Sequence, residues 1–151
     1  MRNLLALLFI GLSTHISFSQ CNFASIENSA ESKIGKYIEI KTYQFDVNKL
    51  GSSKEIEYSY VLGKDKEYVF SINNENSPNP KIIITLYNSN KKAIASNYNE
   101  KAGTYNSTFY YKCPATKLYY ITFTVKDESN CAACVIGFKA TNSEKVNAQK
   151  W

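Results

Sequence analysis

Histidine, arginine and methionine are absent from the chain after its first twenty residues. The single copies of these residues are His15, Arg2 and Met1. Without histidine, the Ser-His-Asp and Cys-His arrangements of nucleophilic catalysis cannot be built, and zinc sites that use imidazole are excluded. Without arginine, bidentate recognition of carboxylate or phosphate is excluded. The sequence also contains no P-loop, no G-x-G-x-x-G and no G-x-S-x-G motif.

These absences predict a protein that is not an enzyme and that carries no cofactor and no metal. Hydrolysis by paired carboxylates is the enzyme class that they leave open. The candidate carboxylates, Asp65, Asp127 and Glu128, lie in expected turns. Carboxylates in turns are usually only solvated.

Long apolar runs are also scarce, and none is long enough to span a membrane. The run Leu4–Leu12 follows a positive start and precedes a small, polar segment. This pattern is typical of a secretory signal peptide cleaved after Ser19. We expect a signal peptide at 1–19, one β-sandwich domain at 20–141 and a flexible tail at 142–151. The protein would be secreted or periplasmic. A lipoprotein acylated at Cys21 is the alternative, but the preceding Gln20 is not the small residue that a lipobox requires.

The net charge of +5 is spread along the chain, with no basic run longer than Lys91-Lys92. A nucleic-acid interface would show a clustered basic patch, so we expect no nucleic-acid partner. Lysine, asparagine and tyrosine are abundant. Such side chains could contact anions and stack on sugars, although AT-rich codon usage explains the same composition.

The four cysteines, Cys21, Cys113, Cys131 and Cys134, all follow the signal peptide. A C-x-x-C pair can belong to a zinc site, a thiol redox centre or a disulfide framework. A Cys₄ zinc site usually needs two such pairs, and a redox centre needs the pair at a helix start. Here the pair runs into an expected strand. In an exported protein we therefore expect two structural disulfides, for which sequence alone allows three pairings.

Alternating apolar residues predict about eight short strands separated by turns, which indicates an all-β, antiparallel β-sandwich. Tyr37–Val47 changes parity midway, which predicts a bulge or a bend. A hairpin is expected from 55–62 and 68–72 around a turn at 63–66, and another from 118–126 and 133–140. A short helical turn is expected within 27–35. The other expected strands are 81–87, 92–98 and 105–112.

The longest polar loop expected is Asn73–Pro80. It offers Asn73, Asn74, Glu75 and Asn76, whose side chains suit sugar hydroxyls or a weak calcium site. Tyr98 and Tyr105, which flank a neighbouring loop, could supply a stacking face. We predict a binding module for an extracellular glycan or peptide. The alternative is a structural or interaction protein of the cell envelope with no small ligand.

The order of strands from Tyr58 to Phe138 resembles that of a group of small secreted β-sandwich proteins of flavobacteria and other Bacteroidetes. The resemblance rests on YVLGKDKEYVF, IITLYN, IAS, FYYKC, YYITF and CAACVIGF. It is similar, more loosely, to pre-peptidase C-terminal domains, which implies a jelly-roll-like sandwich. In the group one cysteine precedes the Tyr-Tyr-Ile strand and one precedes the last strand. The resemblance therefore implies Cys113–Cys131, with Cys21–Cys134 as an additional bridge. It brings no catalytic residues.

Overall fold

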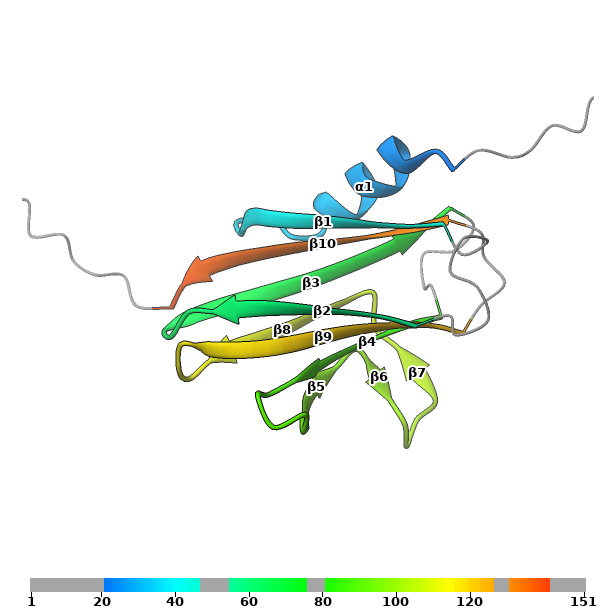
Figure 1. The fold of residues 1–151 in the computed structure, drawn as a ribbon. Coiled ribbons are helices and arrows are strands. Elements are labelled where there is room, and N and C mark those ends of the chain that lie inside the picture. The colour runs from blue at the N-terminus through cyan, green and yellow to red at the C-terminus, as the bar shows by residue number, and fades with distance from the viewer. Residues whose placement is uncertain (1–20, 47–54, 76–80, 127–130, 142–151) are drawn as a thin grey trace, which may run out of the picture.

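The fold was analysed in a computed structural model, which describes residues 21–46, 55–75, 81–126 and 131–141. One helix and ten strands follow each other along these residues (Figure 1). Their bounds are α1 (Phe23–Glu31), β1 (Ile38–Asp46), β2 (Glu55–Leu62), β3 (Lys66–Asn74), β4 (Ile82–Tyr87), β5 (Ala93–Ser96), β6 (Tyr98–Asn99), β7 (Thr104–Tyr105), β8 (Thr108–Cys113), β9 (Lys117–Val125) and β10 (Cys131–Ala140).

Eight of these strands form two four-stranded antiparallel sheets that face each other. Sheet A has the order β1-β10-β3-β8, and sheet B has the order β2-β9-β4-β5. The remaining strands, β6 and β7, form a separate two-stranded ribbon. In both sheets early strands alternate with late ones, which is the strand order of a jelly roll. The prediction of an all-β, jelly-roll-like sandwich is confirmed.

The two long hairpins expected from the sequence are wrong. β2 pairs with β9 in sheet B, whereas β3 pairs with β10 and β8 in sheet A. The same holds for β9 and β10, which lie in different sheets. Strands that alternate toward one shared core look alike whether they pair side by side or face each other across it. Period-2 alternation therefore cannot separate a hairpin from a connection that crosses between sheets.

The turn at 63–65 shows how such a crossing connection is held. The Asp65 N–H donates to the Cys113 carbonyl over 3.1 Å, and the Thr141 N–H donates to the Asp65 carbonyl over 2.9 Å. The Gly63 N–H donates to the Tyr68 hydroxyl over 2.8 Å. The polar groups of the turn are thus bonded to the end of β8, to β3 and to the residue after β10, and not to β2.

The core lies between the sheets and is built from alternate residues of each strand. β4 is the simplest case, because Ile82, Ile84 and Leu86 are buried and the residues between them are half-buried. Rings from both sheets meet in the middle: Phe45 lies 4.8 Å from Phe123, measured between ring centroids. Burial of such side chains stabilises the fold by about 1.5–3 kcal/mol each.

The parity change in β1 is accommodated by the predicted bulge. The register against β10 shifts around Ile40. Ile40 packs against the core together with Tyr43 and Phe45, while Ile38 is left 64% exposed. A bulge adds one residue to one strand, so the residues after it change faces.

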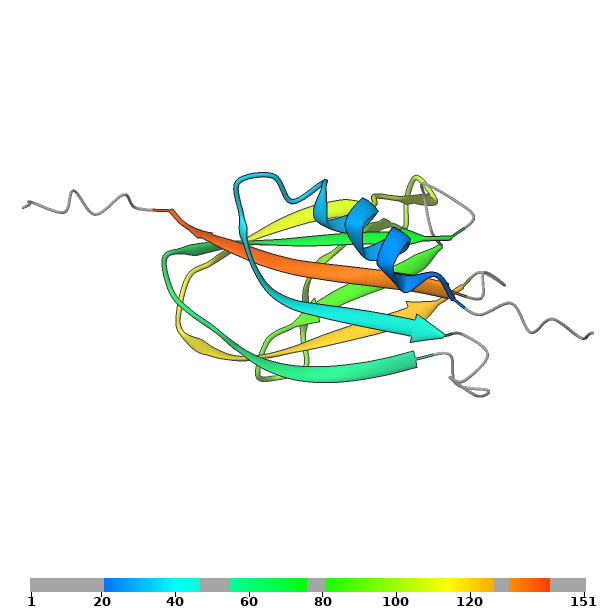
Figure 2. The ribbon, with the colours of Figure 1, turned by 90° about the horizontal axis from the view of Figure 1, so that it is seen from above.

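The helix α1 covers the outer face of sheet A, where it lies over β10 (Figure 2). It starts at the N-cap Asn22, whose side chain accepts from the Ser25 N–H. Its apolar residues Ile26 and Ala30 pack onto the sheet. β10 is therefore buried on both faces from Cys131 to Gly137, as expected of a strand covered on both sides.

The structure contains one disulfide, Cys21–Cys131, with a Cα–Cα distance of 5.5 Å. Cys113 and Cys134 are free and buried. The expected pairs Cys113–Cys131 and Cys21–Cys134 are therefore both wrong. The bridge joins the residue before the N-cap of α1 to the start of β10.

The pairing follows from strand register and parity. Cys113 lies opposite Lys66 at the start of β3, while Ala132 lies opposite Asn74 at its end. Eight residues of strand separate these positions, roughly 26 Å at about 3.3 Å per residue. That distance is far beyond the reach of a disulfide.

Parity excludes the second expected pair. Cys131 packs with Cys21 on the face under the helix, whereas Cys134 belongs to the core cluster between the sheets. Residues three apart on a strand point to opposite faces. Cys21 can therefore reach Cys131 but not Cys134.

Thiol titration is expected to find no reactive cysteine in the native protein and two after unfolding without a reductant. Cys113 is 3% exposed and Cys134 is fully buried. Burial also raises the pKa of the Cys134 thiol, and only the thiolate reacts. The measurement is titration with an aromatic disulfide reagent before and after guanidinium is added. Four thiols after unfolding would contradict the bridge, and two in the native state would contradict the burial.

Candidate functional site

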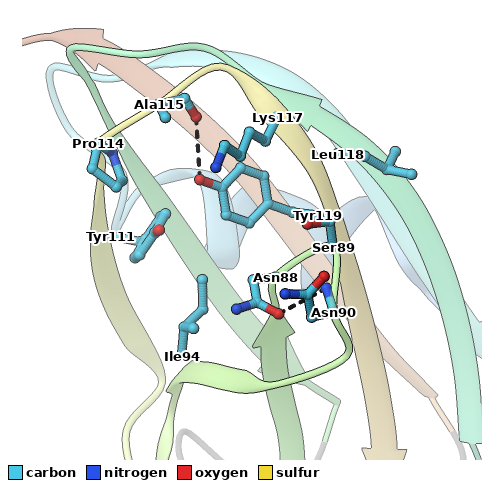
Figure 3. Close-up of a pocket in the computed structure, with 10 residues that line it drawn as sticks. All are labelled: Asn88, Ser89, Asn90, Ile94, Tyr111, Pro114, Ala115, Lys117, Leu118 and Tyr119. Atoms are coloured by element: carbon cyan, nitrogen blue, oxygen red, sulfur yellow. Dashed lines mark hydrogen bonds between the residues drawn. The ribbon is translucent and has the colours of Figure 1, made fainter.

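A pocket of about 260 Å³ opens at one end of the sandwich, between the β4–β5 turn and the β8–β9 turn. Figure 3 shows its lining: Pro114, Tyr111 and Ile94 follow one another along one side, and in this view the Tyr119 ring lies above Asn88 and Asn90 of the β4–β5 turn. The complete lining is Asn88, Ser89, Asn90, Ile94, Tyr111, Pro114, Ala115, Lys117, Leu118 and Tyr119.

The β4–β5 turn is held in shape by its first asparagine. The Asn88 side-chain oxygen accepts from the Asn90 and Lys92 N–H groups, each over 3.0 Å. Lys91 takes the left-handed backbone conformation, with φ of 57°, and its N–H donates to the Asn88 carbonyl over 2.9 Å. These hydrogen bonds fix the backbone of the turn, so the turn side chains that line the pocket project from a rigid backbone.

Tyr119 fixes the β8–β9 side of the pocket. Its hydroxyl donates to the Ala115 carbonyl over 3.2 Å, and the Cys113 thiol contacts the same carbonyl at 3.2 Å. The ring packs edge-on against Tyr111, with 5.8 Å between centroids. Burial first, and then its contacts with Tyr111 and Cys113, raise the pKa of the Tyr119 hydroxyl. The hydroxyl therefore stays protonated and acts as a donor at physiological pH.

The groups that line the pocket combine apolar surface with hydrogen-bond donors. Ile94 and Leu118 are 37% and 40% exposed. Asparagine amides, a serine hydroxyl and the Lys117 ammonium stand beside them, and none of the lining residues is a carboxylate. Convergent polar groups on an apolar, aromatic wall are what small-ligand sites are made of.

The structure places the residues of the predicted site in two separate elements, the end of β3 and the β6–β7 ribbon. Asn73 and Asn74 are not in a loop, because β3 extends through Asn74. Asn74 is only 3% exposed, and the Asn73 amide donates to the Asn74 carbonyl over 3.3 Å. Glu75 is exposed, and Asn76 lies outside the described residues.

Asn73, Asn74 and Glu75 do line a second, smaller pocket of about 140 Å³ together with residues of α1 and its N-cap. Lys33 donates to the Asn73 side-chain oxygen over 3.2 Å. Burial lowers the pKa of that lysine. The prediction that these residues bind a ligand stays a prediction.

Tyr98 and Tyr105 lie elsewhere, on the β6–β7 ribbon. They are register partners, with 4.7 Å between their ring centroids. In Figure 1 the ribbon extends on the side of the sandwich away from α1, and neither tyrosine lines the pocket of Asn73 and Asn74. The two rings pack on each other, and their predicted role as a stacking face for a ligand stays a prediction.

The pocket between the β4–β5 and β8–β9 turns was not predicted from the sequence. Its turn segments fall between expected strands, Asn88–Lys91 between 81–87 and 92–98, and Cys113-Pro114 between 105–112 and 118–126. What the sequence could not show is that turns about 25 residues apart meet at one end of the sandwich, because the expected hairpins were wrong.

No helix within the described segments is long and apolar enough to cross a membrane. Those segments also hold no group of three or more histidine, cysteine, aspartate or glutamate side chains placed to share a metal ion.

Comparison with known proteins places the chain in no family. No family model matches it, and no curated protein matches its sequence. Among solved structures it is similar to Aeromonas hydrophila PliG, a periplasmic lysozyme inhibitor of g-type lysozyme. The identity is 11%, the TM-score is 0.46, and the match covers 69% of this chain and 89% of that one. A likeness at this level carries no function to the chain, and the resemblance to flavobacterial secreted proteins stays a prediction.

Proposed function

We propose that the protein is an exported, non-catalytic binding module for an extracellular glycan, and that the pocket between the β4–β5 and β8–β9 turns is its binding site. The observation that carries the proposal is the pairing of ring and aliphatic surface from Tyr111, Ile94 and Leu118 with side-chain donors on the Asn88–Asn90 turn. A sugar ring has an apolar face, which can pack on the ring and aliphatic surface. It also has a rim of hydroxyls, which can bond to the side-chain donors. Secretion is supported by the signal-like segment 1–19 and by the Cys21–Cys131 bridge.

The size of the pocket limits what it receives. At about 260 Å³ it is slightly smaller than sites for drug-sized ligands, which begin at about 300 Å³. It therefore suits a single sugar unit, for example the end of a chain. The rest of the glycan would extend over the exposed turns.

A glycan array probed with the processed protein tests the proposal. Substitution Asn90→Ala removes an exposed amide at the pocket and is expected to weaken binding about fivefold, the cost of one hydrogen bond. The melting temperature should not change, because the turn is held by Asn88 and not by the Asn90 side chain.

Asn28→Ala is the matched control. It removes an exposed amide from α1, which does not contribute to this pocket, and should leave glycan binding unchanged. An array without any signal would refute the glycan module.

The second candidate is an interaction protein of the cell envelope. The observation in its favour is the β6–β7 ribbon, which extends from the sandwich (Figure 1) and carries the Tyr98 and Tyr105 rings, tilted by 40° to each other with 4.7 Å between their centroids. A flat array, together with a purified envelope protein bound by the wild type but not by Tyr105→Ser, would favour this candidate.

A further inference from the structure

The fold gathers lysines around the proposed binding pocket. Lys117 lines it directly. Lys92 ends the β4–β5 turn, where its N–H donates to the Asn88 side chain. Lys64 is brought alongside because its N–H donates to the Thr116 hydroxyl, 2.9 Å away in the β8–β9 turn. All three lysine side chains are exposed. In sequence they lie about 25 residues apart, so no basic run marks them.

The carboxylates near this end do not balance those lysines. Asp65 stands 4.0 Å from Lys64 in the same turn. Glu57 is held by Lys91, whose ammonium also lies 3.3 Å from the centroid of the Tyr120 ring. Glu67 is held by Lys139 over 3.4 Å and also bonds the Tyr37 hydroxyl. Lys92 and Lys117 have no carboxylate partner among the described residues, so this end carries excess positive charge.

The pocket lining also lacks negative charge. Its polar side chains are amides, hydroxyls and one ammonium, with no carboxylate. The Asn88 oxygen is already used by two N–H groups of its own turn, so Asn88 offers the pocket mainly its NH₂ donors. The side chains of this lining donate more hydrogen bonds than they accept. They therefore favour a ligand group that only accepts hydrogen bonds, such as an anionic oxygen.

We infer that the glycan bound at this pocket is acidic: one sugar ring lies on the Tyr111–Ile94 wall, and its carboxylate or sulfate group is bound by Lys117. This inference rests on the proposed function, since it names the ligand class of the same site. Because lysine is a point donor without the fork of arginine, the site selects for charge more than for the geometry of the acidic group.

Titration calorimetry with galacturonate oligosaccharides tests the inference, and the methyl esters of the same oligosaccharides are the matched ligand. Esterification keeps the sugar rings and removes the charge. The acidic oligosaccharide is expected to bind at least tenfold more tightly than its ester. Lys117→Gln should lower affinity for the acid about tenfold, the effect of losing a hydrogen bond to a charged group, and should lower affinity for the ester by a clearly smaller factor. A sulfated oligosaccharide forms a further arm that distinguishes the two acidic groups.

Lys126→Gln is the control variant. Lys126 is exposed at the opposite end of β9, where its N–H donates to the Lys81 carbonyl over 2.8 Å. Lys126→Gln changes the net charge as much as Lys117→Gln does. The comparison therefore separates binding of the acidic group by Lys117 from long-range attraction between the protein and the acidic ligand. Equal losses in both variants would overturn the inference, and so would equal binding of acid and ester. In the second case glycan binding itself stands. If no oligosaccharide binds, acidic or neutral, the proposed function fails as well.

Discussion

Replacement of Asn97 by alanine is expected to lower the free energy of unfolding by about 2–6 kcal/mol, because two buried backbone groups, the Ile84 N–H and the Ile82 carbonyl, lose their partner at about 1–3 kcal/mol each. Asn97 is fully buried. Its side-chain oxygen accepts from the Ile84 N–H over 2.7 Å. Its amide donates to the Ile82 carbonyl over 2.9 Å and to the Asn106 carbonyl over 3.1 Å. One side chain thus completes the bonding of β4 where β5 has ended and also ties down the base of the β6–β7 ribbon.

Urea denaturation followed by circular dichroism measures this effect. Asn97→Asp should also be strongly destabilising, since its carboxylate would face two carbonyl oxygens that need a donor. Asn106→Ala is the control: that side chain is exposed, and such surface changes usually stay within about 0.5 kcal/mol. If Asn97→Ala and Asn106→Ala had equal stabilities, Asn97 would not anchor the ribbon.

The double substitution of Cys21 and Cys131 by alanine is expected to cost about 3–5 kcal/mol. The bridge joins positions 110 residues apart, and long closed loops restrict the unfolded chain most, by about 4.7 kcal/mol for 100 residues in the chain-entropy model. The folded state also loses the covalent attachment of α1 to β10. The nine-residue α1 is too short to be stable alone, and the bridge fixes its first end to β10.

Differential scanning calorimetry with and without dithiothreitol measures the contribution. The reductant should lower the melting temperature of the wild type toward that of the double variant and should not change that of the variant itself. A wild type that is insensitive to the reductant, once thiol titration has shown that the bridge is reduced, would contradict the prediction.

The sequence predicted the class of the fold because alternation is a local property of each strand. The bulge in β1 was visible for the same reason, as a change of parity between Ile38 and Tyr43. Partners were not predictable, because pairing depends on which sheet a strand joins. The exposed and buried faces of 55–62 would look the same in a hairpin and in a connection between sheets.

The cysteine pairing failed because the resemblance placed cysteines along the chain and not on the faces of the strands. A parity argument at Cys131 and Cys134 separates them, but only once α1 is known to cover the outer face of sheet A. The helix itself was expected four residues too late. Its N-cap Asn22 lies directly after Cys21, within the expected start of the domain.

The pocket between the β4–β5 and β8–β9 turns lies apart from the site predicted from the sequence. That prediction named the amides after Ile72 together with Tyr98 and Tyr105, whereas the pocket is lined by Asn88, Asn90 and Tyr111. The polar stretch after Ile72 attracted attention because it is polar, yet β3 continues through it to Asn74. A polar stretch is therefore weak evidence for a loop when it directly follows a strand, because polar residues can also continue the strand.

The position of β10 determines when during synthesis the chain can fold. This strand is the last of the ten, yet it lies between β1 and β3, the first and third, and every one of its sheet partners precedes it by at least 57 residues. A ribosome therefore releases almost the entire domain before sheet A has its central strand, and β1 has no neighbour until then. Contacts between such distant segments slow folding. The domain should consequently complete its fold only after synthesis is nearly complete, and a nascent chain that ends before residue 131 should lack the central strand of sheet A and the pairing of β1.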